Sequence, residues 1–573
     1  MIVEKIFYTG VKGKMTVTAL PQLNTDVWRI KSVTSDSLII SDVSNKSFNV
    51  TCNAYEDFMG DITLNIEYTD NHTPHYISER SITFTFKGLH REVETANFSI
   101  VNNGTGSLNV TWVCENPIHT FNVDYAIGDI SDDVEYVNRG LNYTNTTTFS
   151  DVISIPAGKA LYLHSDVMEQ WGDKEQSSSY RFKITGHSDL SLAGDILSLI
   201  RNKKMTKNYT FANLFHSLNC ITVPKMPRNL YYGCFQYMFR YATIQTLPDD
   251  MLPATSLPPH AYQGMFRDSN ISKMPILYAT NVGEESCREM FSMSEVQDVS
   301  NEIHFYNIEA YGCFEMFFHC NNITTPPDIS GIKFVTTESL LGMFRECGNL
   351  VSDAIFAPDI TIYGSRSFQA MYQNCRSLTT VHKFEFKSKL TESCCYQMYN
   401  GCSSLVNVPE DMLSNPEWGE FAFADMFIDC TSLQNTPAFT HTTIPIGLCM
   451  SMFIGCTSLT SIPELPADYV PDYAYVNMFR GCTGITSAVL PATTVANENS
   501  YASMFDGCTS LSYVKMMSLT GAGGSGTLNF GNWLNNVASN GTFVMNPNAT
   551  YDVDASRGKN GIPEGWTVIT AIE

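Results

Sequence analysis

The stretch MFIGCTSL, residues 452–459, decides the fold because it returns along the chain. Close copies read MYNGCSSL at 398–405, MFIDCTSL at 426–433 and MFDGCTSL at 504–511, and looser copies extend the series towards the N-terminus. The aromatic residue in the second position serves as the anchor of each copy. The anchors are Phe215, Phe239, Phe266, Phe291, Phe317, Phe344, Tyr372, Tyr399, Phe427, Phe453, Phe479 and Phe505. Successive anchors lie 24 to 28 residues apart, and self-similarity at such a period predicts a solenoid.

Apolar or small residues recur at positions −4, −1, 0 and +3 relative to the anchor. This i, i+3, i+4, i+7 spacing is typical of one face of a helix, so we expect each copy to contain a helix of about two to three turns. An apolar residue at +6, such as Leu459, follows a bend and begins a short extended run. The predicted repeat is therefore a helix, a turn, a short strand and a return loop.

Eight of the 17 cysteines occupy position +3, and they are Cys320, Cys347, Cys375, Cys402, Cys430, Cys456, Cys482 and Cys508. Ala242 and Ser269 fill the same position in earlier copies, which indicates a requirement for a small residue rather than for sulfur chemistry. We interpret these cysteines as reduced, buried packing residues. Zinc binding is disfavoured because each repeat supplies one such thiol without a CxxC motif or paired histidines.

The pattern of the whole chain predicts a multidomain protein. Residues 1–88 and 91–190 alternate apolar and polar residues in short runs, which favours two N-terminal β-sandwich modules of immunoglobulin-like type. The second module also caps the solenoid, which is predicted as an α/β leucine-rich-repeat domain of about twelve repeats over 205–518. Residues 519–573 form a small C-terminal cap.

Individual aromatic residues fit this division. Trp112 lies in a clear strand pattern and is expected in the core of the second module. A helical spacing over 192–200 predicts a short helix that leads into the repeats. Trp533, Phe543 and Trp566 are expected to cover the last repeat.

Composition excludes several functional classes. A net charge of −23 argues against nucleic acid as a partner, because phosphate binding requires clustered Lys and Arg. No stretch approaches the 18 or so apolar residues of a membrane span, so we expect no membrane insertion. Charged residues interrupt every apolar run near the N-terminus, which predicts synthesis in a cytoplasm without export by the usual routes.

The MFxGCTSL phrase and the aromatic residue before it resemble the BspA-like leucine-rich-repeat family over about residues 205–518. The loops LPATSL (252–257), ELPADYV (464–470) and LPATTVA (490–496) are similar to the loops between longer repeats of that family. The segments WLNNVASNGTFV (533–544) and GIPEGWTV (561–568) resemble the usual C-terminal ending of such proteins. Such proteins occur in gut Bacteroidales bacteria and in the virions of their phages. The resemblance implies surface recognition and adhesion, and it supplies no catalytic residues.

Motifs for cofactor or metal chemistry are incomplete. Gly521, Gly523 and Gly526 match GxGxxG, but they follow a repeat array instead of the strand of a βαβ unit. Residues 551–561 have partial EF-hand spacing without its glycine, and residues 72–75 (HTPH) lack a third metal ligand. We therefore predict no catalytic residue, no cofactor, no metal site and no enzymatic activity.

Trp418, Tyr469 and Tyr473 are the candidate binding residues. They fall in loops between the repeats, outside the packing columns. Such aromatic side chains can stack on sugar rings or anchor a protein interface. The alternative is that each packs locally within its loop.

We expect a phage virion structural protein, a head or tail fibre or a capsid decoration protein. Its β modules would bind other virion proteins, and its solenoid would bind host-surface or mucus glycans or proteins. We expect a homo-oligomer, a dimer or trimer. The alternative is an adhesin of the same family at the bacterial cell surface, which the absent export signal disfavours. A carbohydrate-active enzyme would need a catalytic module, and the domain assignment leaves no segment for one.

Overall fold

The computed structural model describes most of residues 97–571 with their side chains. These are residues 97–114, 123–129, 152–173, 179–490, 500–518, 531–548 and 561–571, without 358, 384–385, 387 and 415–416. Several further strands are described by their backbone alone. The chain forms two compact units, Met1–Ala96 and Asn97–Glu573. Each unit is described by itself, and the boundaries predicted within the second unit stay predictions.

The described strands of the first unit form two antiparallel sheets. One has the order β1-β4-β3, with β1 at Lys14–Thr18, β4 at Ser47–Thr51 and β3 at Ile39–Ser41. The other has the order β2-β5-β6, with β2 at Trp28–Thr34, β5 at Phe58–Thr69 and β6 at Ile77–Gly88. The strands agree with the predicted β content, while the immunoglobulin-like arrangement stays a prediction.

The second unit begins with two further antiparallel sheets that share one core. The larger sheet, β10-β9-β12-β7-β14, contains Leu141–Tyr143, Phe121–Gly128, Ala160–His164, Ser99–Asn102 and Leu190–Ala193. The smaller sheet, β11-β8-β13, contains Ile153–Ile155, Leu108–Val113 and Arg181–Thr185. Trp112 is fully buried in this core, as predicted. The short helix predicted over 192–200 is a 3-10 helix, η1, at Ile196–Leu199, followed by η2 at Arg201–Lys203.

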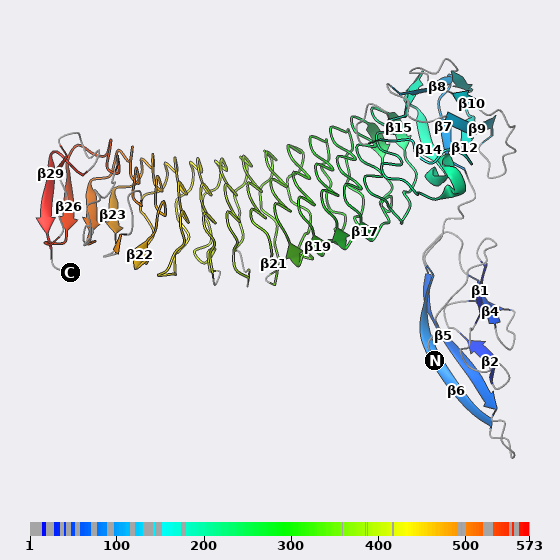
Figure 1. The fold of residues 1–573 in the computed structure, drawn as a ribbon, viewed down its shortest axis with the longest axis horizontal. Helices are drawn as coiled ribbons and strands as arrows, with labels where there is room; N and C mark the ends of the chain where they lie inside the picture. Colours follow the sequence, from blue (N-terminus) through cyan, green and yellow to red (C-terminus); the bar gives the residue numbers. More distant parts are fainter. Residues whose placement is uncertain are drawn as a thin grey trace. The chain divides into compact units, whose positions relative to one another are not determined.

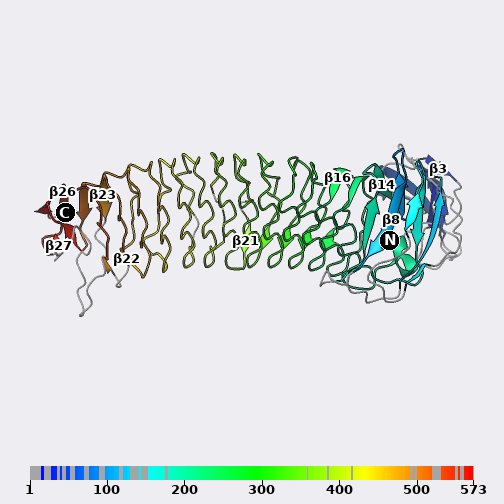
Figure 2. The same cartoon turned by 90° about the horizontal axis from the view of Figure 1, so that it is seen from above.

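The coils of a β-solenoid continue from these sheets, as Figures 1 and 2 show. The first coil is joined to the sheets by backbone hydrogen bonds, in which the N–H of Trp171 donates to Thr210 and the N–H of Phe182 donates to Leu214. The Phe182 ring lies 5.4 Å from the ring of the first anchor, Phe215. These contacts join the sheets to the first coil, and the role of the module as the N-terminal cap of the solenoid stays a prediction.

Short parallel strands line the solenoid. The five-stranded sheet β17-β18-β19-β20-β21 contains Ser256–Leu257, Asn281–Val282, Asn307–Ile308, Phe334–Val335 and Thr361–Ile362. Further parallel pairs are β15 (Asn219–Thr222) with β16 (Thr243–Thr246), β22 (Tyr469–Val470) with β24 (Thr494–Val495), and β27 (Val553–Asp554) with β28 (Ile562–Pro563). In each described coil of β17–β21 the second residue of the strand is buried and faces the core.

The predicted helix of each repeat is wrong. The segments around the anchors are consecutive tight turns, and the only helices among the described residues are η1 and η2. Around the anchor Phe239, the N–H of Met238 donates to the carbonyl of Phe235 in the same coil at 3.2 Å. The N–H of Phe239 instead donates to the carbonyl of Met265 in the next coil at 2.9 Å. Alternate N–H groups therefore bond within a coil and between coils. We call the stack of these segments the turn ladder.

The turn ladder has a repeat of four residues, marked by a left-handed backbone at every fourth position. In the coil of Phe239 these residues are Gly233, Tyr237 and Tyr241, with φ of 59°, 53° and 58°. A four-residue repeat brings two adjacent positions inward in each turn. Positions −4, −1, 0 and +3 are therefore buried here, as they would be on a helix of 3.6 residues per turn. The two structures share one apolar pattern, and that pattern misled the prediction.

The anchors form one continuous stack of aromatic rings through the solenoid. Neighbouring ring centroids are 5.3 to 5.8 Å apart, and the ring planes differ by 1° to 17°. Each ring is fully buried. Offset stacking of this kind adds about 0.5–1.5 kcal/mol per pair to the hydrophobic contribution. The core of the solenoid therefore runs along the anchor column.

The C-terminal segment extends the solenoid by adding strands. The parallel sheet β23-β25-β26-β29 contains Ser487–Leu490, Tyr513–Met516, Gly541–Met545 and Trp566–Thr570. Trp533, Phe543 and Trp566 are buried, as predicted for a cap. The indole N–H of Trp533 donates to the carbonyl of Gly561 at 3.0 Å, and that of Trp566 donates to Ala538 at 2.9 Å.

Candidate functional site

The cysteine column bonds successive coils together. Each thiol donates to the carbonyl oxygen of the anchor in the preceding coil, for example Cys320 to Phe291 at 2.9 Å and Cys430 to Tyr399 at 3.2 Å. The same contact recurs at 3.0 to 3.2 Å for Cys347, Cys375, Cys402, Cys456, Cys482 and Cys508. The thiols are free and buried, which confirms their interpretation as packing residues.

Burial also suppresses the chemistry of these thiols. It raises the pKa of Cys320 to about 12, and it raises the pKa of Cys508 to about 12 as well. The pKa of Cys456 and of Cys482 is raised well above the ordinary value, again chiefly by burial. Because the thiolate is the reactive form, thiols with such pKa values are inert near neutral pH. The column is a structural feature of the solenoid.

Ion pairs cover part of the outer surface of the turn ladder. Arg345 contacts Glu315 at 2.6 Å, and Arg288 contacts Glu285 at 3.1 Å. The guanidinium of Arg345 also lies 4.7 Å from the centre of the Phe318 ring. Within each of these partly buried pairs the two opposite charges neutralise one another. This surface therefore offers few unpaired charges to a ligand.

The three aromatic residues predicted to bind a ligand are not equivalent in the structure. Trp418 is buried, at 7% exposure, and its ring lies 4.0 Å from that of His441 and 5.6 Å from that of Phe423. These contacts favour the alternative of local packing for Trp418. Tyr469 and Tyr473 are exposed, at 50% and 43%. Tyr469 lies in β22, and Tyr473 has a left-handed backbone with φ of 60° at the start of its turn segment.

A larger group of aromatic residues than this pair of tyrosines lies on the solvent-facing side of the β17–β21 sheet and of the segments next to its strands. We define the aromatic strip as Tyr278, His304, Tyr306, Phe334 and Tyr363. The Tyr306 and Phe334 rings are 5.4 Å apart at 66°, and the Phe334 and Tyr363 rings are 6.1 Å apart at 17°. The Tyr278 and His304 rings are stacked at 5.7 Å. The exposed fractions of Tyr306 and Tyr363 are 47% and 68%.

The short strands hold the aromatic strip in place. Ile303 and Phe305 are buried while His304 and Tyr306 are exposed, so the two exposed rings project from one face of the chain. Asn307 is in register with Phe334, which is in register with Thr361 of the following coil. The rings therefore cross several coils at a spacing set by backbone hydrogen bonds.

Sequence reasoning missed the strip because it sought aromatic residues in the loops. A signal was present in the column ten residues before the anchor. This column holds a polar residue in most coils, among them Asn281 and Asn307, and an aromatic residue in two coils, Phe334 and Tyr469. Of the aromatic strip, only Phe334 belongs to this column. Because other coils carry a polar residue such as asparagine at this position, its side chain is expected to face solvent. An aromatic residue at the same position therefore indicates an exposed ring. Tyr469 thus occupies the same column as Phe334, in a later coil.

One buried acid interrupts the apolar core. Asp353 has a fully enclosed carboxylate that accepts hydrogen bonds from the Tyr399 hydroxyl at 2.7 Å and from the His382 backbone N–H at 3.0 Å. Its second contact with His382 is to the ring Nδ1, at 2.6 Å. The Tyr372 hydroxyl accepts the N–H of Ala354 at 3.0 Å. Tyr372 and Tyr399 are the two tyrosines among the anchors, and their hydroxyl groups hydrogen-bond to the buried Ala354 N–H and to the Asp353 carboxylate.

Burial raises the pKa of Asp353 to about 6, although the hydrogen bonds from Tyr399 and His382 lower it. Asp353 lies inside the solenoid, where its carboxyl group holds the Tyr399 and His382 side chains in place. We therefore assign this cluster to stability. Among the described residues, no three potential metal ligands gather in one place, and no helix is long and apolar enough to cross a membrane. The predicted motifs at 72–75, 521–526 and most of 551–561 lie outside the described residues.

Comparisons with family models, with curated proteins and with solved structures find no match to this chain. The assignment of function therefore depends on the β-solenoid and on the surfaces that it displays.

Proposed function

We propose that this chain is a non-enzymatic recognition protein that binds host-surface or mucus glycans or proteins through the aromatic strip. The supporting observation is the row of rings held across consecutive coils, with the exposed residues Tyr306 and Tyr363 on either side of Phe334. Exposed apolar surface of this kind on a regular scaffold marks an interaction site. Tyrosine supplies a large, rigid and amphipathic contact area at a low cost in conformational entropy.

The proposal extends to the setting in which the protein acts. We propose a head or tail fibre or decoration protein of a phage virion, in keeping with the resemblance to BspA-like repeats. The N-terminal β modules would bind other virion proteins, and two or three copies would assemble. The side of the solenoid would then present the aromatic strip to a host surface.

Replacing both tyrosines, in the variant Tyr306→Ala/Tyr363→Ala, is expected to weaken binding to mucin-coated plates and to intact Bacteroidales cells by at least about tenfold. The reason is that loss of two aromatic contacts at an interface costs more than about 1.4 kcal/mol. The measurement is the bound fraction of the labelled full chain as a function of its concentration.

The matched control is Tyr231→Ala/Tyr513→Ala, which removes two exposed tyrosines outside the strip, at 38% and 36% exposure. We expect this control to bind as the unaltered chain does. Equal binding by the two double variants would show that the strip is not the recognition surface. Tyr469→Ala, tested alongside, reports whether the equivalent position of a later coil contributes.

Mass spectrometry of purified phage particles tests the proposed location. We expect peptides of this chain in virions at a stoichiometry comparable with that of other minor structural proteins. Their absence from the particles, together with their presence in the outer surface fraction of bacterial cells, would support the adhesin instead.

A further inference from the structure

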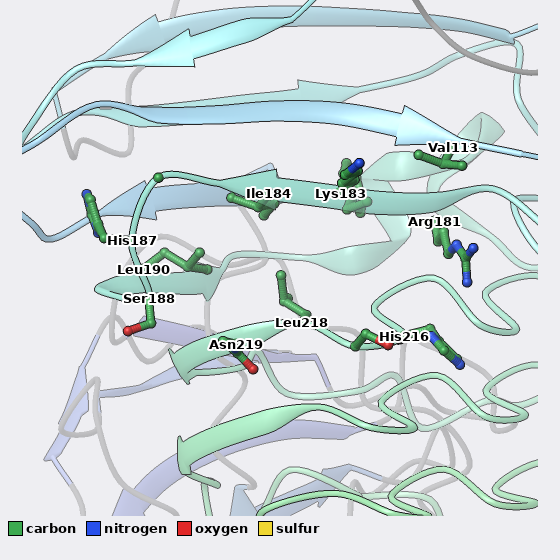
Figure 3. Close-up of a pocket in the computed structure, with 13 residues that line it drawn as sticks. Val113, Arg181, Lys183, Ile184, His187, Ser188, Leu190, His216, Leu218 and Asn219 are labelled. Carbon is green, nitrogen blue, oxygen red and sulfur yellow. Dashed lines mark hydrogen bonds between the residues drawn. The ribbon is translucent and has the colours of Figure 1, made fainter.

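A pocket lies where the smaller sheet of the second unit meets the first coil. It has a volume of about 640 Å³ and is lined from three directions. Strand β13 contributes Arg181 and Lys183, and the turn after β13 contributes His187 and Ser188. The first coil contributes residues 216–219, which follow its anchor Phe215. Figure 3 shows these side chains around the space between β13 and β15. A pocket of this size accommodates a ligand of one or two sugar rings.

The charge of the pocket is opposite to that of the chain. Arg181, Lys183, His187 and His216 line it, and none of the 13 lining residues is an aspartate or a glutamate. The whole chain nevertheless carries a net charge of −23. Among the described residues, neither Arg181 nor Lys183 forms an ion pair. Within the described part of the chain these two cations have no acidic partner, and two such cations in a concave site create a positive potential that attracts anions.

The electrostatics of His216 agree with this potential. Burial, together with the positive charges of Arg181 and Arg240, lowers the pKa of His216 to about 4. The imidazole is therefore neutral near pH 7, and its Nδ1 lies 2.8 Å from the Ser217 hydroxyl. In Figure 3 the guanidinium of Arg181 extends towards the loop that carries His216.

Polar and apolar groups complete the lining. Ser188, Ser217 and Asn219 offer hydroxyl and amide groups that can bond to ligand hydroxyls. Leu190 and Leu218 supply an apolar floor. Arg181 and Lys183 alternate with the buried Phe182 along β13, so they lie on one face of that strand.

We propose that this pocket binds a saccharide of one or two rings through a carboxylate or sulfate group, which Arg181 and Lys183 contact. An arginine fork matches the two oxygens of a carboxylate or sulfate, and the bonds formed are charge-assisted. The hydroxyls of the saccharide bond to the serine and asparagine side chains. The proposal does not rest on the recognition function assigned to the aromatic strip, because the pocket and the strip share no residue.

Titration calorimetry of the full chain with glucuronic acid and with galactose 6-sulfate tests the proposal. Glucose serves as the neutral probe, and inorganic phosphate serves as the anion without a sugar. We expect both acidic sugars to bind at least about tenfold more tightly than glucose or phosphate, which corresponds to about 1.4 kcal/mol. The affinity for the acidic sugars should also fall as the salt concentration rises.

The variant Arg181→Gln is expected to weaken the binding of both acidic sugars by about tenfold or more, and Lys183→Gln should weaken it as well. Arg228→Gln is the matched control, because it removes the same charge from an exposed residue outside the pocket lining. Thermal unfolding of each variant confirms that the fold is retained.

Three results would overturn the proposal. The first is that neither acidic sugar binds at concentrations up to about 10 mM, where the unaltered chain should be largely occupied. The second is equal affinity of Arg181→Gln and Arg228→Gln. The third is phosphate binding as tight as that of glucuronic acid, which would show that the pocket recognises an anion without its sugar.

Discussion

Replacing the anchor Phe317 by alanine is expected to lower the free energy of unfolding by about 3–5 kcal/mol. The Phe317 ring is fully buried and stacks on the rings of Phe291 and Phe344 at 5.3 and 5.4 Å. Truncation leaves a cavity in the middle of the stack and removes two ring contacts. Equilibrium unfolding in urea, followed by tryptophan fluorescence and circular dichroism, measures the change.

The effect should also appear in the shape of the transition. A solenoid coil contacts only its neighbours, so a defect in one coil weakens the coupling between the coils on either side. We expect the unfolding curve of Phe317→Ala to broaden or to separate into two steps, with the two probes no longer coincident.

Phe318→Ala is the matched control, because it makes the same change at the adjacent residue. The Phe318 ring is partly exposed, and it lies 4.7 Å from the Arg345 guanidinium and 6.0 Å from the His319 ring. A contact of this kind is worth about 0.5–1 kcal/mol at an exposed site. A loss for Phe318→Ala equal to that for Phe317→Ala would show that the anchor column is not the core.

Asp353 is expected to make the stability of the solenoid depend on pH by about 3 kcal/mol between pH 4 and pH 8. The pKa of Asp353 is raised by burial from 3.8 to about 6 in the folded chain. Each pKa unit corresponds to about 1.4 kcal/mol of free energy. The folded state therefore binds the proton more tightly than the unfolded state. The contribution is fully present below pH 4 and is lost as the pH rises through 6.

The variant Asp353→Asn should remove this dependence. An asparagine can still accept the hydrogen bond from the Tyr399 hydroxyl, and it carries no charge to bury. We expect the unaltered chain to lose stability relative to Asp353→Asn as the pH rises from 4 to 8. The free energy of unfolding in urea at intervals of half a pH unit measures the difference.

Asp411→Asn controls for the loss of one acidic charge. The Asp411 side chain is 60% exposed and pairs with Lys383 at 3.3 Å, so its contribution is screened by solvent. We expect its stability to differ from that of the unaltered chain by less than about 1 kcal/mol at every pH. Parallel curves for the unaltered chain and Asp353→Asn would contradict the assignment of the titration to this group.

The turn ladder shows how far an apolar pattern can be interpreted. Positions −4, −1, 0 and +3 were correctly predicted as buried, because the inward positions are the same for a helix and for turns of four residues. The glycine of MFIGCTSL distinguishes turns of four residues from a helix. Gly455 has φ of 71°, and the equivalent residues Asn374 and Asp429 have φ of 62° and 57°. Glycine, asparagine and aspartate are the residues that adopt this conformation most readily, and glycine is disfavoured inside a helix.

The exposure of the candidate aromatic residues could be predicted only in part from the sequence. Tyr469 was predicted from its loop-like setting and is exposed, whereas Trp418 was predicted from the same setting and is buried against His441. Whether a ring outside the packing columns faces solvent depends on the return loops of neighbouring coils. Their lengths vary between repeats, so their packing could not be inferred from one copy alone.

By itself the sequence determined the repeat, its period, its anchor column and the burial of its cysteines, because each repeat must bury the same side chains against its neighbours. Only the tertiary structure decided that the anchor segment consists of turns. Half of the backbone N–H groups of this segment donate to the next coil. The residue pattern of a single repeat does not reveal a hydrogen bond to another repeat. The aromatic strip and the basic pocket likewise bring together residues from different coils or sheets. Their proximity follows from the stacking of the chain, which no local pattern encodes.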